Sequence, residues 1–189
     1  MVQNRQQQVQ DLLVFALLVA IGVAGRWGQP EWCFTPTAAA AIFAGMYFSR
    51  AAIAALVPVA ILAIGDVFLL PPHDSIPVII ATYGAMAVPV LLGRWVRRSE
   101  SRLSAAWRWG VCGFLPATLF FVVTNFAVWA FQSDYDKSLV GLGQCYWAAV
   151  PFYRWMLAGD VFYLAVLLAC WLLAGASLQK VEHAVEPAK

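Results

Sequence analysis

The fold class of this chain is decided by residues 109–131, which read WGVCGFLPATLFFVVTNFAVWAF. This stretch contains no charged side chain. An α-helix rises about 1.5 Å per residue, so a helix of this length spans the roughly 30 Å hydrocarbon core of a bilayer. We therefore expect residues 109–131 to form a transmembrane helix that contains Pro116.

The rest of the chain has the same apolar character. Hydrophobic residues make up 62% of the 189 residues, charged residues make up 12%, and the mean hydropathy is +0.74. Soluble domains contain roughly 25% charged residues. The sequence therefore predicts one all-α transmembrane domain, residues 1–189, with no room for a separate soluble domain. Its six helices would cover 109–131 and five further apolar stretches, at about 11–25, 36–48, 51–70, 76–96 and 155–174.

Two of these stretches need comment. Residues 36–48 are few for a full crossing of the bilayer. Residues 11–25 are not followed by a small-residue cleavage site, so we expect them to remain as the first helix and not to be removed as a signal peptide.

The basic residues predict the orientation of the bundle. Cytoplasmic loops are enriched in Lys and Arg, and the connection between the fourth and fifth stretches carries five arginines: Arg94, Arg97, Arg98, Arg102 and Arg108. Six crossings then place both termini in the cytoplasm and leave only Arg26, Lys137 and Arg154 on the outer side. The net charge of +2 gives no indication of nucleic-acid binding.

Residues 132–154, between the last two stretches, are unusual. They begin with polar residues and continue with glycines and aromatic residues. This segment is long for a connection and too apolar for a free loop. We expect an outer lid, or a short helix that lies at the membrane interface.

The few polar residues inside the stretches share the outer half of the bundle. At about 1.5 Å per residue, Asp66 lies about 6 Å, Asn125 about 9 Å and Tyr83 about 10 Å below the outer helix ends. Asp160 lies about one turn below the start of the last stretch. Charged groups in a membrane usually face a bundle interior or a wet cavity, so these residues predict an outward-facing ligand pocket. The alternative is that Asp66 and Asp160 only cap helix ends.

Four residues near the outer surface are further candidates for ligand binding. Arg154 is either an interfacial anchor or a partner for a carboxylate or for an anionic group of a ligand. Trp32, Tyr146 and Tyr153 belong to a concentration of outer aromatic side chains. Such residues form an aromatic belt at the interface or stack on a flat ligand.

Three outer residues carry metal-binding side chains. His73 lies in a rigid Pro-Pro-His-Asp turn, where it is either solvated or ligates a metal carried by the ligand. The four cysteines form no CxxC motif. Cys33 and Cys145 both fall on the outer side, where a disulfide, free thiols or a soft metal ligand are the alternatives. No intrinsic cofactor is expected.

The first stretch carries small residues on one helical face, at Ala16, Ala20 and Ala24. Small residues let another helix approach closely, either within the bundle or in a partner membrane protein. The chain lacks a Walker A motif, an HExxH motif and a GxSxG motif, so we expect neither ATP hydrolysis nor these kinds of hydrolase chemistry.

Several motifs in this order resemble an uncharacterised bacterial family of transport proteins. That family commonly has Asn-Phe-Thr-Pro where this chain has Cys33 before Phe34-Thr35-Pro36. The other motifs that carry the resemblance are Phe43-Ala44-Gly45, Val57-Pro58, Gly65-Asp66, Thr124-Asn125, Gly141-Leu142, Cys145-Tyr146, Pro151-Phe152-Tyr153 and Gly159-Asp160.

More distantly, the layout is similar to that of the substrate-binding S components of energy-coupling-factor vitamin transporters. The resemblance implies six helices, cytoplasmic termini, the bacterial inner membrane and an outward pocket for a vitamin. It also implies that Ala16, Ala20 and Ala24 dock a transmembrane coupling subunit with its ATPases. Solitary S components that serve cobalamin suggest that ligand, and His73 or Cys33 as a ligand to its cobalt.

The first hypothesis is therefore a non-enzymatic binding component for vitamin uptake, with cobalamin as its ligand. The second is a membrane enzyme or redox protein that uses Cys33, Cys145 and His73. The third is a non-catalytic subunit that serves assembly alone.

Overall fold

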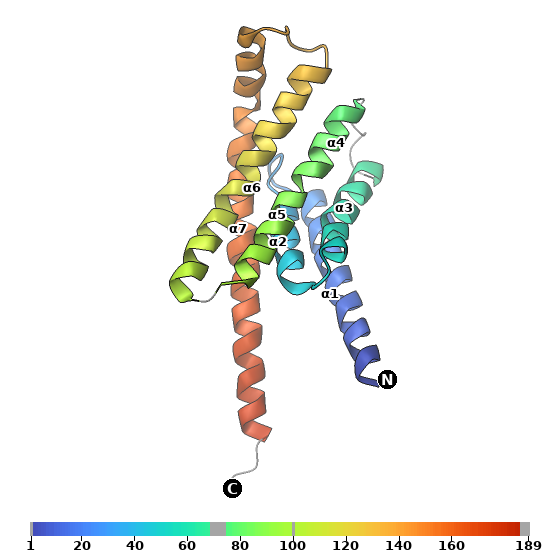
Figure 1. Cartoon of the computed structure of the whole chain (residues 1–189), viewed down its shortest axis with the longest axis vertical. Coiled ribbons are helices and arrows are strands. Elements are labelled where there is room, and N and C mark those ends of the chain that lie inside the picture. The colour runs from blue at the N-terminus through green and yellow to red at the C-terminus, as the bar shows by residue number, and fades with distance from the viewer. Residues whose placement is uncertain (1, 69–74, 100, 186–189) are drawn as a thin grey trace.

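The computed structural model describes residues 2–68, 75–99 and 101–185. The described residues contain no strand and form seven helices (Figure 1): α1 (Val2–Trp27), α2 (Thr37–Tyr47), α3 (Ala51–Phe68), α4 (Ile76–Ala85), α5 (Ala87–Arg97), α6 (Arg102–Phe131) and α7 (Leu139–Val185). The start of α1 and the end of α7 lie at the same end of the bundle.

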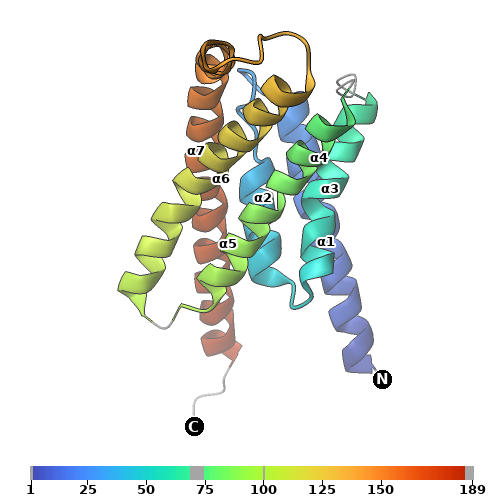
Figure 2. The same ribbon diagram turned by 45° about the horizontal axis from the view of Figure 1, so that its top comes forward.

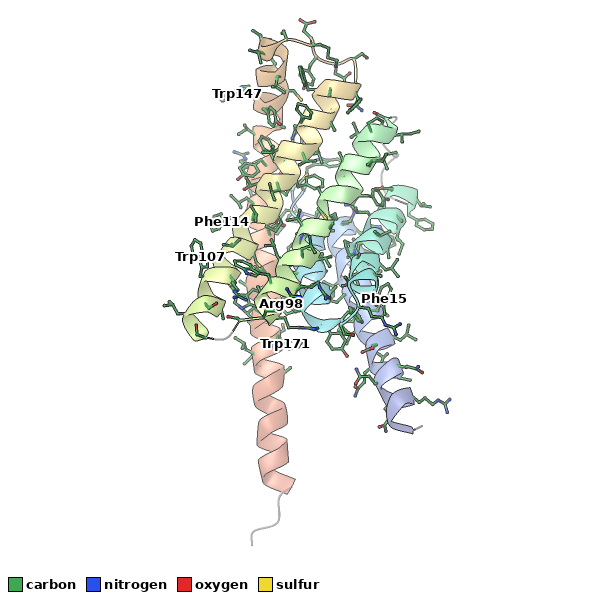
Figure 3. The ribbon with its side chains drawn as sticks, viewed as in Figure 1. Phe15, Arg98, Trp107, Phe114, Trp147 and Trp171 are labelled. Carbon is green, nitrogen blue, oxygen red and sulfur yellow. The ribbon has the colours of Figure 1, made fainter. Side chains whose placement is uncertain are left out.

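Five helical segments of the described chain are long and apolar enough to cross a membrane: Arg5–Trp27, Ala51–Phe68, Ile76–Arg97, Leu103–Phe131 and Leu139–Ala174. The predicted all-α class and the multi-pass character of the chain are thereby confirmed at this level. Large aromatic side chains point away from the bundle (Figure 3), and Trp107, Phe114 and Trp147 are more than half exposed. Such a surface suits contact with lipid and not with water.

The sixth predicted crossing, residues 36–48, is the short helix α2. Its 11 residues span about 16 Å at 1.5 Å per residue, about half of the hydrocarbon core. α2 lies in the middle of the bundle and packs against α1, α3, α5, α6 and α7. Thr37 to Gly45 are all buried. Its alanines make this possible, because small side chains let several helices approach one axis.

The closest of these contacts joins α2 and α5. A Cβ atom on Gly93 would lie 1.9 Å from the carbonyl oxygen of Ile42, and a Cβ atom on Gly45 would lie 2.1 Å from that of Val90. The two glycines therefore let the backbones touch, and any side chain at either position would separate them. Ile42 and Val90 belong to the main apolar core, together with Val57, Ile61 and Leu164.

The fourth predicted crossing is bent into two helices, α4 and α5, which meet at Met86. Pro89 lies in the first turn of α5. Proline lacks the N–H that would bond to the carbonyl four residues earlier, so it bends or breaks a helix at this point. The bend leaves Met86 buried in the bundle, at the base of the cavity described below.

Residues 132–154 differ from the expected lid. The helix α7 begins at Leu139 and continues without interruption past residue 154. The Ser138 hydroxyl accepts a hydrogen bond from the Gly141 amide at 3.1 Å, which is an N-cap. The rings of Tyr146 and Tyr153 pack edge-on or tilted against Phe121 of α6. Residues 139–154 are therefore the first part of a long helix that packs on α6, where the sequence predicted a lid or a short interfacial helix.

The connection between α6 and α7 is accordingly short, residues 132–138. The Lys137 ammonium donates hydrogen bonds to the carbonyls of Trp129 and Gln132, near the end of α6. The indole N–H of Trp129 donates to the Asp136 carbonyl at 2.9 Å. The Lys137 bonds satisfy carbonyls that the end of α6 leaves unpaired, and the Trp129 bond holds the turn against α6.

Candidate functional site

A cavity of about 480 Å³ lies among α1, α2, α3, α4, α6 and α7. It occupies the half of the bundle where α1 and α3 end and α2, α4 and α7 begin (Figure 2). Its volume falls in the range of small-molecule sites. Seven of the ten predicted binding residues line it: Trp32, Cys33, Asp66, Tyr83, Asn125, Tyr153 and Asp160.

One wall of the cavity is a polar cluster that joins three helices. Asp66, near the end of α3, accepts a hydrogen bond from the Tyr83 hydroxyl of α4 at 2.8 Å. The Arg26 guanidinium, at the end of α1, lies 3.6 Å from the other carboxylate oxygen of Asp66. Asp66 is therefore paired within the protein, and its role is more than that of a helix cap. Its cationic partner is Arg26, where the sequence suggested Arg154.

Asp160 is the second carboxylate of the cavity, and its surroundings are different. The residue is 5% exposed, and its Oδ2 atom has no hydrogen-bond partner among the described residues. The carboxyl lies against the backbone amide of Ala117, halfway along α6. Among the described residues that line the cavity, Asp160 is the buried acid without a basic partner.

The position of Asp160 along its helix differs from the prediction, which placed it about one turn after the helix start. Because α7 begins at Leu139 and not near residue 155, Asp160 lies about 30 Å along that helix. Gly159, the residue before it, has no side chain, and a Cβ atom there would lie 3.1 Å from the Thr35 amide. The loop before α2 can therefore pack directly against α7 at the level of Asp160.

The α6 wall combines aromatic rings with polar side chains that are already bonded. The Thr124 hydroxyl and the Asn125 amide each donate to a carbonyl one turn earlier, those of Phe120 and Phe121, at 2.8 Å. The Tyr153 hydroxyl of α7 lies 3.0 Å from the Thr118 hydroxyl. A ligand would therefore meet mainly aromatic rings here, with Asn125 offering its remaining amide atoms.

The loop between α1 and α2 brings Trp32 and Cys33 to the cavity. Cys33 has a φ angle of 71°, the one positive φ among described residues other than glycine, and its amide donates to the Gln29 side chain at 3.1 Å. Burial raises the pKa of the Cys33 thiol above its ordinary value, although the Arg26 charge opposes the shift. A positive φ is uncommon for residues other than glycine, and Asn tolerates it better than most.

Three predicted binding residues are not in the described cavity. The Tyr146 hydroxyl donates to the Val122 carbonyl at 2.7 Å, on the α6–α7 contact. Arg154 is exposed, with its guanidinium 5.4 Å from the centre of the Trp155 ring, as suits an interfacial anchor. His73 lies outside the described residues.

The cysteines are unpaired in the structure, so Cys33 and Cys145 form no disulfide with each other. The Cys145 thiol is buried and donates to the Asn125 carbonyl at 3.4 Å. In the part of the chain that the structure describes, no group of three or more His, Cys, Asp or Glu side chains is close enough to hold a metal ion.

Sequence reasoning missed several residues that line the cavity: Arg26, Gln29, Thr35, Thr37, Thr82, Met86 and Met156. Arg26 could have been found, because it is one of only three basic residues on the predicted outer side. The threonines and methionines carry no such signal, since both types are common in membrane helices. Ala16, Ala20 and Ala24 are exposed on α1 and do not pack within the bundle.

Comparisons with curated proteins and with solved structures find no significant match to this chain. The comparison with family sequence models finds a match. The sequence model of a family of unknown function, DUF6580, matches residues 6–183, nearly the whole chain. The chain therefore belongs to the DUF6580 family of unknown function.

Proposed function

We propose that this protein is a membrane-embedded binding component for the uptake of a vitamin or a related micronutrient. The observation that carries the proposal is the cavity of about 480 Å³ with Arg26, Asp66, Tyr83, Asn125 and Asp160 on its walls. Polar groups from several membrane helices converge on one space there, and intramembrane charged groups mark ligand pathways in membrane proteins. The proposed role is capture and transfer of the ligand, without catalysis.

The volume of the cavity limits the ligand. A water molecule takes about 30 Å³ of liquid, so the cavity corresponds to about 16 waters, or roughly 15–25 non-hydrogen atoms of an organic ligand. Cobalamin, which the resemblance implies, is several times larger and would require the cavity to widen. Cobalamin is therefore the largest ligand that we propose for the cavity. Cys33 is the described cavity residue that could approach its cobalt.

The proposal includes an orientation and a partner. With the arginine-rich connection around Arg97 in the cytoplasm, the cavity half of the bundle faces outward, in the bacterial inner membrane. The exposed alanines Ala16, Ala20 and Ala24 then lie on the lipid-facing side of α1, where a transmembrane coupling subunit with ATPases would dock. Energy for release into the cell would come from that partner, because this chain has no Walker A motif.

The test is ligand binding by the purified protein with a matched pair of variants. Co-purifying small molecules are identified by mass spectrometry, and a panel of vitamins that includes cobalamin is screened by thermal stabilisation. Ala149 lines the cavity, whereas its neighbour Ala148 is exposed and does not. We expect Ala149→Phe to abolish binding and Ala148→Phe to preserve it. Absence of any vitamin ligand, or normal binding by Ala149→Phe, would contradict the proposal.

The alternative of an outer-surface thiol enzyme is less well supported. Cys33 lines the cavity, but the Cys145 thiol is buried and bonded to a carbonyl of α6. The two cysteines would have to act separately. Replacing both with Ser discriminates the hypotheses, because vitamin binding would survive the change and thiol chemistry would not. A purely assembling subunit would tolerate apolar replacements of Asp66 and Asp160.

A further inference from the structure

The charges on the cavity wall do not balance. Among the described residues, three charged side chains line the cavity: Arg26, Asp66 and Asp160. Arg26 and Asp66 form an ion pair at 3.6 Å, and Tyr83 donates a further hydrogen bond to Asp66. Asp160 is left without a cationic partner among the described residues, so the wall carries one uncompensated acid.

The position of that acid makes the imbalance costly. Asp160 is 95% buried, and its Oδ2 atom accepts no hydrogen bond from a described residue. It lies against Ala117, in the middle of α6, which places it far from both ends of the bundle. An acid at this position is compensated either by a bound proton or by a cation, since hydrocarbon does not solvate a carboxylate. The cavity lies next to Asp160 and offers a place for such a cation.

The other cavity residues select the kind of compensating group. Phe120, Phe121, Phe152 and Tyr153 line the same space. Aromatic rings present a negative face, which attracts cations and repels anions. A positively charged nitrogen can therefore pair with Asp160 while an apolar or aromatic body fills the space between the rings.

We infer that the cavity binds a small organic monocation, whose positively charged nitrogen lies against the Asp160 carboxylate. The inference deepens the proposed function, on which it rests for the identification of the cavity as a ligand site. It assigns Asp160 the role of counter-ion, and it assigns Asp66 a role in joining α1, α3 and α4. Of the two carboxylates, only Asp160 sets the charge of the ligand.

Three soluble indoles of similar size test the inference: tryptamine, which is a cation, tryptophol, which is neutral, and indole-3-acetate, which is an anion. Binding to the purified full-length protein is measured by isothermal titration calorimetry. Because the probes share one ring, differences in affinity report the charge of the side group. We expect tryptamine to bind about tenfold or more tightly than tryptophol, and indole-3-acetate to bind most weakly.

Asp160→Asn should lower the affinity for tryptamine about tenfold or more and leave that for tryptophol unchanged. The control is Asp134→Asn, which removes the same charge from an exposed position outside the cavity. If Asp160→Asn does not fold, Asp160→Glu retains the charge and should retain the preference for tryptamine. Equal binding of the three probes to the wild-type protein, or an unchanged tryptamine affinity in Asp160→Asn, would overturn the inference.

The outcomes separate this inference from the proposed function. A neutral or anionic vitamin that binds in the cavity, together with no preference among the indoles, would refute the cation and leave the uptake proposal standing. A clear preference for tryptamine without binding of any vitamin would support the cation site and refute vitamin uptake.

Discussion

Gly93→Ala is the substitution for which the structure gives the clearest expectation. A Cβ atom at this position would lie 1.9 Å from the Ile42 carbonyl oxygen and 3.0 Å from the Met46 amide nitrogen. Both neighbours are backbone atoms of α2, so no change of side-chain rotamer relieves the clash. An ordinary contact needs about 3.4 Å, and α5 would have to move away from α2 until that distance is reached.

The cost follows from the size of that movement. Inserting atoms into a packed core typically costs about 1–3 kcal/mol. We expect the upper end, about 3 kcal/mol, because the clash involves backbone on both sides and α2 is the centre of the bundle. In a protein of 150–250 residues, 1 kcal/mol shifts Tm by about 2–4 °C. Gly93→Ala should therefore lower Tm by about 6–12 °C.

The assay is thermal unfolding of the purified protein in detergent, followed by intrinsic tryptophan fluorescence. The control is Gly84→Ala on α4, where a Cβ atom would meet nothing within 4 Å. Alanine is favoured over glycine in a helix by about 0.5–1 kcal/mol, so the control should unfold at the wild-type temperature or slightly above it. A Gly93→Ala protein that unfolds within about 2 °C of the wild type would refute the close α2–α5 contact.

Three further predictions concern the walls of the cavity. Tyr83→Phe removes the hydrogen bond to Asp66 and should lower the free energy of unfolding by about 1 kcal/mol. The same thermal assay measures the change, and an unchanged Tm would mean that the bond does not stabilise the protein. Cys33→Asn should keep or raise Tm, because Asn tolerates the φ angle of 71°. Cys33→Val should lower Tm, because a β-branched residue does not tolerate that angle. A higher Tm for the Val variant than for the Asn variant would contradict the positive φ angle at Cys33. Burial raises the pKa of the Cys33 thiol, so maleimide labelling of Cys33 should reach half of its maximal rate at a higher pH than labelling of a short unstructured peptide that carries one cysteine. A half-maximal rate at the same or a lower pH than in the peptide would contradict the raised pKa, and Cys33→Ala is the control that assigns the label.

Local sequence features determined the class of this protein. Residues 109–131 and the other long apolar stretches predicted membrane helices because the preference for lipid is a property of each segment alone. Five segments of the described chain are long and apolar enough to cross a membrane, although several of them are longer than the predicted stretches. The residues of the candidate site were partly predictable for the same reason: Asp66, Tyr83, Asn125 and Asp160 are conspicuous in apolar helices, and all four line one cavity.

Contacts between distant residues decided the rest. The length of α2 could be read from the sequence, but its central position depends on five helices that pack around it. The first turns of α7 make aromatic contacts with Phe121 of α6, and the start of α7 at Leu139 determines where along that helix Asp160 lies. Which carboxylate is paired is likewise a tertiary property, because Arg26 reaches Asp66 across 40 positions of sequence while no described cation reaches Asp160. The hydropathy of a segment is a property of its own residues, whereas the pairing of charges and the burial of side chains depend on which helices pack against each other.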